Sequence, residues 1–542
     1  MSHPRPLRNM SRPEWLILLV LLLLAALGRM AALDHPAYWE DEMGTVMNLL
    51  ALPGGDHEFR PVDHRWFESQ PRRDTWAAYH QALFENEDSP YLYFDLIRLW
   101  SHCFGLSEPA LRSLSALFSL AGVALLALLA WRLLPGRAWL VATALAAVHP
   151  YLLELGRDAR PYALTLLLAP LSLVLLWRIG RGEAHRWHHA TYVVALAALL
   201  YTHYFNAFFV GAQLATLLLA WKRSAAWGHG LAAALLFTPG LWVFYTKLTL
   251  IRGAERRIWI QAGADSSLGD WFQYALTVPK KMLVGSTFLS SHPLLPVLVV
   301  IAGAAALLLV VLGSRRLYHH SPRTALSLGL LVALPVTAVF VSDQVLDLYS
   351  IASPRYLIYV FIPLILLMAI PAEKRATRRL QAGLAVVVGL GLMVGLVYYF
   401  RSPRLLMDWR VQAEAIAAAV GPEGLVVADK AHSGGCLAWY FPEPRRLACN
   451  PDLSTIRREL AGRTGRLLAY LPLKFRPDSL TELPTTRLDP LVREGLLRIE
   501  RVTSPPNRYR SIIYFRIQNG VRPGAWGGNE KGHPRRDGPN VW

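Results

Sequence analysis

Long blocks of apolar residues recur over the first 400 positions, and they constrain the fold more than any other feature. A helix needs about 20 apolar residues to span a bilayer. We count eleven such blocks, which predict a polytopic α-helical membrane protein. They lie at residues 14–33, 109–134, 138–155, 161–179, 189–205, 206–222, 227–247, 291–313, 323–342, 355–372 and 380–400.

Basic residues gather in alternate short loops, and such loops are expected on the cytoplasmic side. The N-terminal segment before the first span shares this character, with Arg5, Arg8 and Arg12, and we predict that this span is retained. The loops carry Arg132, Arg137, Arg178, Arg181, Arg186, Lys222, Arg223, Arg315, Arg316, Arg323, Lys374, Arg375, Arg378 and Arg379. Topology therefore explains most of the net charge of +18, and nucleic acid is a poor hypothesis for the partner.

A cytoplasmic N-terminus places residues 34–108 and everything after 400 on the external face, as in a bacterial inner (plasma) membrane. The first of these segments is rich in aromatic residues and predicts short helices in the membrane interface. The segment 248–290 has the same character, and only three cysteines occur in the chain. Two of them, Cys436 and Cys449, could pair outside the cell, which the sequence leaves open.

The composition changes after Pro403, where strand-like runs replace the apolar blocks. The predicted domains are a transmembrane domain at 1–402, a small extracytoplasmic α/β domain at 403–518 and a disordered Gly- and Pro-rich tail at 519–542. The expected strands are 425–428, 467–471 and 512–517, with a helix at 411–420.

Three consecutive carboxylates, Glu40, Asp41 and Glu42, follow the first span directly. Ionisable groups at the edge of a membrane bundle are costly to bury and often functional. Asp41 is the first candidate and Glu42 the second, whereas Glu40 is expected to be ordinary surface. The alternative is that these carboxylates only flank the positive end of an interfacial helix.

Three arginines on the predicted external face, Arg157, Arg160 and Arg355, run against the positive-inside trend. Arginine is suited to bidentate contact with phosphate, so these residues predict a site for a phosphorylated amphiphile. Alternatively, they extend to lipid headgroups without contacting a substrate. Asp158 either contributes to the site or pairs with a neighbouring arginine to fix a turn.

Aromatic and histidine side chains fall at the same predicted level, namely Tyr93, Tyr162, His203 and Tyr356. They are candidates for supporting the site. Alternatively, these residues have no role in the site: the tyrosines belong to the aromatic belt of the membrane interface, and the histidine packs at a helix end.

Six motifs resemble, in order and spacing, those of GT-C membrane glycosyltransferases of the protein O-mannosyltransferase and aminoarabinose (lipid A) transferase type. They are Trp39–Glu42, Ser89–Tyr93, Arg157–Leu164, Leu200–Phe205, Trp259-Ile260 and Arg355–Leu357, within residues 14–400. Two departures occur. Ser89 stands where the family has His, and Arg157-Asp158 stands where it has Gln-Glu.

The resemblance implies a GT-C-like fold and transfer of a hexosyl or pentosyl group from a polyprenyl-phosphate donor to a lipid, polysaccharide or protein acceptor on the external face. It implies catalytic roles for Asp41 and Glu42, and donor phosphate binding by Arg160, Arg355 and Arg157. The supporting residues would be Asp158, Tyr162, Tyr93, His203 and Tyr356.

Such a donor already has a good leaving group, so a base for the acceptor suffices. Single displacement with inversion is the expectation, by analogy with hydrolases. No metal ligands are assigned, and assistance by a divalent metal is left open.

Two rival hypotheses come from other classes. A transporter or flippase of polyprenyl-linked sugars would be expected to show paired internal repeats, and we find none. A non-catalytic subunit of polysaccharide assembly would use the C-terminal domain to bind glycan or partner proteins. Sugar transfer by the purified protein separates all three.

Overall fold

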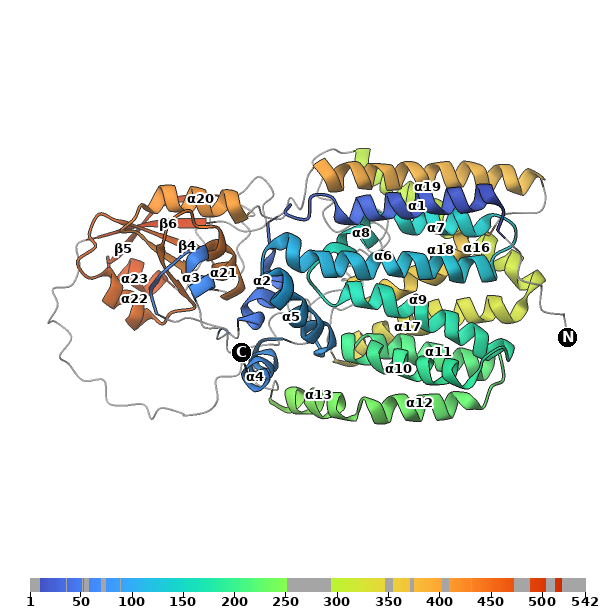
Figure 1. Cartoon of the computed structure of the whole chain (residues 1–542). Coiled ribbons are helices and arrows are strands. Elements are labelled where there is room, and N and C mark those ends of the chain that lie inside the picture. Colours follow the sequence, from blue (N-terminus) through green and yellow to red (C-terminus); the bar gives the residue numbers. More distant parts are fainter. Residues whose placement is uncertain are drawn as a thin grey trace. The chain divides into compact units, whose positions relative to one another are not determined.

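The computed structural model describes residues 10–35, 37–50, 52, 58–69, 75–87, 89–250, 294–346, 354–370, 375–401, 409–429, 431–471, 488–503 and 512–518. The chain divides into two compact units (Figure 1). Unit 1 joins Met1–His35 to Ser89–Pro403, and unit 2 joins Pro36–Asp88 to Arg404–Trp542. The division after Pro403 lies beside the predicted domain boundary, but residues 36–88 cluster with the C-terminal part of the chain.

Unit 1 is a layer of helices, and the long ones run side by side (Figure 1). The helices of unit 1, long and short, are α1 (Arg12–Met30), α5 (Leu92–Phe104), α6 (Glu108–Leu133), α7 (Ala138–Val148), α8 (Pro150–Arg157), α9 (Tyr162–Arg181), α10 (Arg186–Thr202), α11 (Asn206–Leu219), α12 (Ala225–Leu236), α13 (Thr238–Leu250), α16 (Leu294–His320), α17 (Pro322–Leu346), the 3-10 helix η2 (Pro354–Val360), α18 (Phe361–Met368) and α19 (Arg375–Arg401).

Each predicted span coincides with one helix or with two consecutive helices of unit 1. Among the described residues, six helices are long and apolar enough to cross a membrane, or up to eight if each bent pair counts as one span. The expected number of eleven is therefore not confirmed. Helix α11 has 14 residues, which at about 1.5 Å per residue falls short of a hydrocarbon core about 30 Å thick.

Two spans are bent pairs of helices, and each bend coincides with a proline. Helices α7 and α8 meet at an angle of 54°, and α12 and α13 at 57°. His149 has an extended backbone, and Pro150 supplies no N–H to continue the ladder of α7. Pro239 stands near the start of α13 in the same way.

Glycines allow close approach between helices of unit 1. A Cβ added to Gly122 of α6 would lie 2.2 Å from the carbonyl oxygen of Leu166 in α9. A Cβ added to Gly313 of α16 would lie 2.0 Å from the carbonyl oxygen of Leu367 in α18. Small residues at such crossings let two backbones touch, which is how helices associate tightly in an apolar solvent.

Unit 2 is built around a six-stranded mixed sheet with the order β1-β3-β2-β4-β6-β5. Strand β2 pairs in parallel with both β3 and β4, whereas the outer pairs are antiparallel. The elements are α2 (Glu40–Leu49), β1 (Arg60–Val62), α3 (His64–Ser69), α4 (Trp76–Asn86), α20 (Trp409–Val420), β2 (Leu425–Ala428), α21 (Ala431–Tyr440), β3 (Arg445–Cys449), α22 (Leu453–Leu460), β4 (Leu467–Leu471), α23 (Asp489–Arg493), β5 (Leu497–Thr503) and β6 (Ile512–Ile517).

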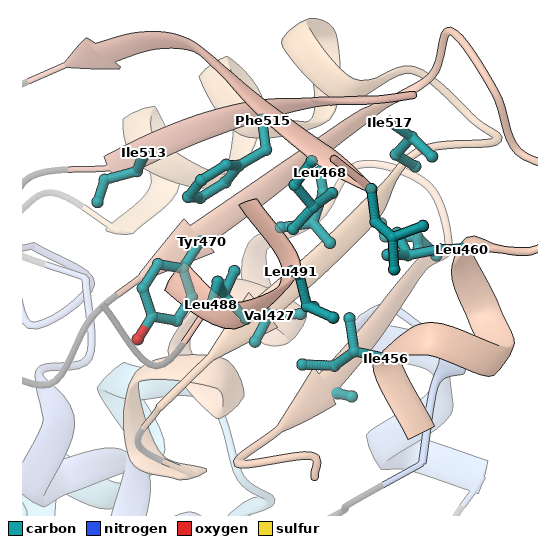
Figure 2. Packing of buried hydrophobic residues seen from close by; sticks show 14 of the residues in the cluster. Val427, Ile456, Leu460, Leu468, Tyr470, Leu488, Leu491, Ile513, Phe515 and Ile517 are labelled. Atoms are coloured by element: carbon teal, nitrogen blue, oxygen red, sulfur yellow. The ribbon is translucent and has the colours of Figure 1, made fainter. Parts of the chain in front are cut away.

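One hydrophobic cluster of unit 2 joins the sheet to α22 and α23 (Figure 2), and further buried residues of the sheet pack against α20 and α21. Leu468 and Phe515 come from paired strands, and Ile456 and Leu491 come from the helices that cover them. All four are fully buried. This burial of aliphatic and aromatic side chains is the main source of stability for a domain of this size.

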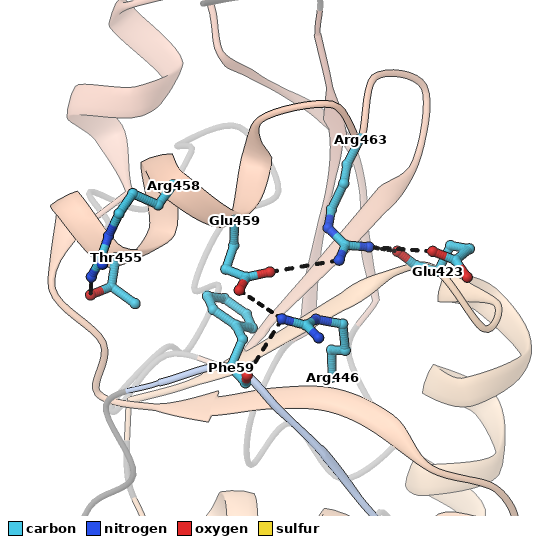
Figure 3. Close-up of polar contacts among 7 residues, drawn as sticks. All are labelled: Phe59, Glu423, Arg446, Thr455, Arg458, Glu459 and Arg463. Carbon is cyan, nitrogen blue, oxygen red and sulfur yellow. Dashed lines mark hydrogen bonds and ion pairs between the residues drawn. The ribbon is translucent and has the colours of Figure 1, made fainter. Parts of the chain in front are cut away.

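Strand β1 comes from the first predicted external segment and completes the C-terminal sheet. It pairs antiparallel with β3, from Arg60 opposite Leu447 to Val62 opposite Arg445. Figure 3 shows the polar contacts at this edge. Arg446 donates to Glu459 at 2.7 Å and to the carbonyl oxygen of Phe59 at 3.5 Å.

The predicted strands 425–428, 467–471 and 512–517 have the same bounds as β2, β4 and β6, and the predicted helix at 411–420 begins two residues earlier as α20. Short helices are present where they were expected after the first span, as α2, α3, α4 and α5, and their placement in the membrane interface stays a prediction. Cys436 and Cys449 are free and buried, so no disulfide joins them here. The tail 519–542 and the residues 251–293, with the Trp259-Ile260 motif, lie outside the described residues.

Candidate functional site

Arg157 lies at the C-terminal end of α8 and is buried. Its guanidinium donates to the carbonyl oxygens of Ala31 and Ala32, at 2.7 and 2.5 Å, and to the Tyr399 hydroxyl at 3.0 Å. The backbone of Ala32 has a φ of 49°, just past the end of α1. Arg157 therefore satisfies carbonyl groups that a helix leaves open at its end. Its predicted contact with phosphate stays a prediction.

Two further arginines hold the same part of unit 1. Arg112 donates to the carbonyl oxygen of Leu33 at 2.9 Å. Arg29, fully buried, donates to Ser119 Oγ at 2.8 Å and to the carbonyl oxygen of Ala147 at 3.0 Å. Arg112 thus holds the turn that follows the first span, and Arg29 ties α1 to α6 and α7. Sequence reasoning missed both residues because most of their partners lie far along the chain.

Arg355 lies among aromatic rings that come from three separate segments. We call Tyr162, His203, Arg355 and Tyr356 the Arg355 cluster. The Arg355 guanidinium carbon is 5.8 Å from the ring centre of Tyr162 and 5.4 Å from that of Tyr356. The His203 ring is 5.6 Å from Tyr162 and 5.4 Å from Tyr356. The structure therefore brings these four predicted residues together.

Further aromatic residues pack against the Arg355 cluster. The Tyr356 ring stacks on Phe205 at 4.6 Å, and the Tyr359 hydroxyl donates to the carbonyl oxygen of Phe205 at 2.9 Å. Tyr151 of α8 is buried and packs against Phe361, with ring centres 5.5 Å apart. A guanidinium near tyrosine faces is attracted by the ring electrons, and this attraction orders the Arg355 side chain within the cluster. Tyr151 was not singled out from the sequence.

Arg160 follows the turn that Asp158 begins, where the Arg160 N–H donates to the carbonyl oxygen of Asp158 at 2.7 Å. Its guanidinium carbon lies 5.5 Å from the ring centre of Phe94. The neighbouring Tyr93 is fully buried, and its hydroxyl is 2.7 Å from Ser115 Oγ. Tyr93 thus joins α5 to α6 and holds Phe94 under Arg160.

The acidic turn opens helix α2 and belongs to unit 2. Glu42 is fully buried and accepts a hydrogen bond from the Trp39 N–H at 3.4 Å. Glu40, which is half-buried, accepts one from Ser433 Oγ at 2.7 Å, a contact that the sequence did not predict. Asp41, half-buried, stands between them. Asp41 and Glu42 thus belong to one unit, and the predicted arginines to the other.

Several basic residues of unit 1 lie near the ends of α9 and α10 that are away from Tyr162 and His203. Arg178 contacts the His188 ring, and Arg223 donates to the carbonyl oxygen of Gly180 at 3.3 Å. Arg137 lies 3.8 Å from Glu14 at the start of α1. This clustering agrees with the alternation predicted from charge, in which one end of the helix layer carries the excess of Lys and Arg.

Over the parts of the chain that are described, no three His, Cys, Asp or Glu side chains gather so that they could hold a metal ion.

Comparisons with known proteins agree with the motifs. Residues 88–243 match the family of dolichyl-phosphate-mannose-protein mannosyltransferases. The structure is similar to that of ArnT from Cupriavidus metallidurans bound to undecaprenyl phosphate, with a TM-score of 0.52, 13% identity, and coverage of 93% of this chain and 98% of that one. It is also similar to apo ArnT from the same organism, with a TM-score of 0.51, 13% identity, and coverage of 92% and 97%. No curated protein matches.

The expected resemblance is thereby confirmed. The chain has the GT-C fold of the ArnT and dolichyl-phosphate-mannose-protein mannosyltransferase type.

Proposed function

We propose that this protein is an integral membrane glycosyltransferase that moves a sugar from a polyprenyl-phosphate donor to a glycan, lipid or protein acceptor. The reaction takes place on the external face of a bacterial inner membrane, with the N-terminus in the cytoplasm. The observation that carries the proposal is the Arg355 cluster, in which a guanidinium is held by aromatic faces at the ends of α9 and α10 that are away from the basic residues.

The donor phosphate is bound by Arg355 and Arg160. Both cations lie over aromatic rings, so their side chains are already ordered before the ligand arrives. Pre-ordered donors stabilise the charge that develops on a leaving phosphate without reorganisation. Arg157 contributes by fixing the turn between α1 and the acidic segment, since its N–H groups already serve Ala31, Ala32 and Tyr399.

Asp41 is the base. The acceptor hydroxyl attacks the anomeric carbon, Asp41 takes the hydroxyl proton, and polyprenyl phosphate leaves with the bonding electron pair. Attack opposite the leaving group inverts the anomeric centre. Asp41 suits this role better than Glu42, because Glu42 is fully buried and accepts from the backbone of its own helix, whereas Asp41 is half-buried.

Binding of undecaprenyl phosphate to the purified protein in lipid nanodiscs tests the donor site. We expect Arg355→Ala to weaken binding at least about tenfold, the loss of one charge-assisted phosphate contact. Arg355→Lys keeps the charge but loses the planar fork and its ring contacts, so its affinity falls between those of the native and alanine proteins. The exposed Arg181 at the end of α9 provides the control, Arg181→Ala. Equal affinities of the Arg355→Ala and native proteins for undecaprenyl phosphate would contradict the proposed phosphate site.

Transfer tests the reaction itself. The purified protein is given radiolabelled undecaprenyl-phosphate sugars and an extract of bacterial envelope glycolipids. We expect label in the glycolipid with the native protein and none with Asp41→Asn. Export of the donor from sealed vesicles without transfer would instead favour a flippase.

A further inference from the structure

Helix α21 presents one stripe of side chains to the segment that leads into the acidic turn. Ser433, Cys436 and Tyr440 are spaced by three and four residues, so they share a face of the helix. All three contact residues 38–40, which directly precede Asp41.

Each member of the stripe makes a hydrogen bond. Ser433 Oγ donates to Glu40 Oε1 at 2.7 Å. The Cys436 thiol donates to the carbonyl oxygen of Tyr38 at 3.7 Å, and the Tyr440 hydroxyl accepts from the Tyr38 N–H at 2.7 Å. The main chain of Tyr38 is thus held on both its polar groups, and the first carboxylate of the turn is held by its side chain.

The contact between α2 and α21 is dry and close. Tyr38 and Cys436 are fully buried, so water does not replace a lost hydrogen bond there. A Cβ added to Gly44 of α2 would lie 3.0 Å from Cε1 of His432. A Cβ added to Gly435 of α21 would lie 3.0 Å from Cγ of Met43. The first turn of α2 therefore has little freedom to shift against α21.

We propose that Ser433, Cys436 and Tyr440 are positioning residues that set the place of the Asp41 carboxylate. The proposal rests on the function above, in which Asp41 is the base. Because a base must lie within hydrogen-bond reach of the proton that it takes, a small shift of α2 lowers the rate of transfer rather than the affinity for the donor. The α/β unit then supplies part of the catalytic geometry from residues about 400 positions away.

Two measurements test it on the full chain in nanodiscs. In hydrogen exchange followed by mass spectrometry, Ser433→Ala and Tyr440→Phe each increase exchange at residues 38–43. In the transfer assay, both lower kcat about tenfold with an unchanged KM for the undecaprenyl-phosphate sugar. Ser433→Thr keeps the hydroxyl and restores both values.

A double-mutant cycle adds a readout that a general loss of stability does not move. Glu40→Ala and Ser433→Ala remove the same hydrogen bond, so their effects on kcat are not additive. The matched control is Asp452→Ala, which removes the N-terminal cap of α22 elsewhere in unit 2 and leaves kcat unchanged.

The outcomes separate the two proposals. Activity in Asp41→Asn overturns the proposed base, even if exchange at residues 38–43 still rises in Ser433→Ala. Normal kcat and normal exchange in both α21 variants overturn the positioning role alone, and so does a loss of kcat in Asp452→Ala that matches theirs.

Discussion

The two units use arginine in opposite ways. In unit 1, Arg29 and Arg157 donate mainly to backbone carbonyl oxygens and hydroxyls within the helix layer. In unit 2, arginines pair with carboxylates nearer the surface, as Arg446 does with Glu459 and Arg516 with Glu500. Arginine therefore holds helix ends together in unit 1, whereas in unit 2 it forms ion pairs near the surface of the sheet.

This difference indicates which arginines contribute most to the stability of the fold. A buried donor that satisfies several carbonyl groups leaves all of them without a partner when it is removed. An exposed ion pair is screened by water and salt, so its removal changes little. Thermal unfolding in detergent micelles measures the contrast, with a maleimide fluorophore that reacts with the buried thiols of Cys436 and Cys449 as unit 2 opens.

The largest effect is expected from Arg29→Met. Its guanidinium serves Ser119 and the carbonyl oxygens of Ala25, Ala146 and Ala147, at 2.8 to 3.2 Å. Leaving the carbonyl groups at the end of α7 and the Ser119 hydroxyl without this donor costs on the order of 3 kcal/mol. Tryptophan fluorescence during heating reports the loss in unit 1. A Tm equal to that of the exposed control Arg181→Met would abolish the contrast between the units.

A second large effect is expected from Gly122→Ala, which sharpens the comparison by testing packing without charge. The new Cβ would lie 2.2 Å from the carbonyl oxygen of Leu166, so α6 and α9 must move apart. Overpacking of this kind costs about 1–3 kcal/mol. Gly329→Ala in α17 is the matched control, because its Cβ would meet nothing within 4 Å. Equal Tm values for the two variants would show that the crossing is loose.

A smaller effect is expected from Asp452→Ala in unit 2. Asp452 caps α22 by accepting from the Thr455 N–H at 2.6 Å, and loss of such a cap costs about 1 kcal/mol. The same N–H holds the pKa of Asp452 below its usual range.

The sign of the pH effect follows from that lowered pKa. The stability contributed by the carboxylate is complete above the unfolded pKa of about 3.9, and it is lost as the pH falls through the folded value. The Tm difference between the native protein and Asp452→Ala should therefore be full at pH 6 and shrink below pH 4. A difference that stays constant down to pH 3 would mean that the ionised cap contributes nothing.

The smallest effect is expected from Glu500→Gln, which breaks the exposed pair with Arg516. We expect a Tm close to that of the native protein in low salt, and the same Tm in 0.5 M NaCl, where surface charges are screened. A loss as large as that of Asp452→Ala, persisting in salt, would place this pair among the structural contacts.

Much of the fold could be predicted because periodicity is local. Strands β2, β4 and β6 are short runs of apolar and aromatic residues, and their predicted bounds agree with the structure. Strand β3 was missed because it opens with Arg445 and Arg446, and β1 because it has three residues with a proline in the middle. Strand β1 is identified only by its pairing with β3, about 385 residues later, which no local sequence pattern reveals.

The site divides in the same way. The motifs could place Tyr162, His203 and Arg355 at one level of the helix layer, and the structure brings them together. The partners of Glu40 and Arg157 could not be predicted, because one is a serine in unit 2 and the others are backbone carbonyls. Such contacts depend on tertiary packing, whereas the sequence pattern reports only which residues are ionisable.

The discontinuity of unit 2 also orders events at the ribosome. Residues 38–62 are synthesised early, yet the hydrogen bonds that hold Tyr38 and Glu40 span 402 and 393 positions. Domains generally fold as units during synthesis. The nascent chain therefore carries its acidic helix through the synthesis of every membrane span before α21 and β3 exist to receive it. The acidic turn is therefore organised late, because its hydrogen-bond partners exist only once the chain has been made through Tyr440.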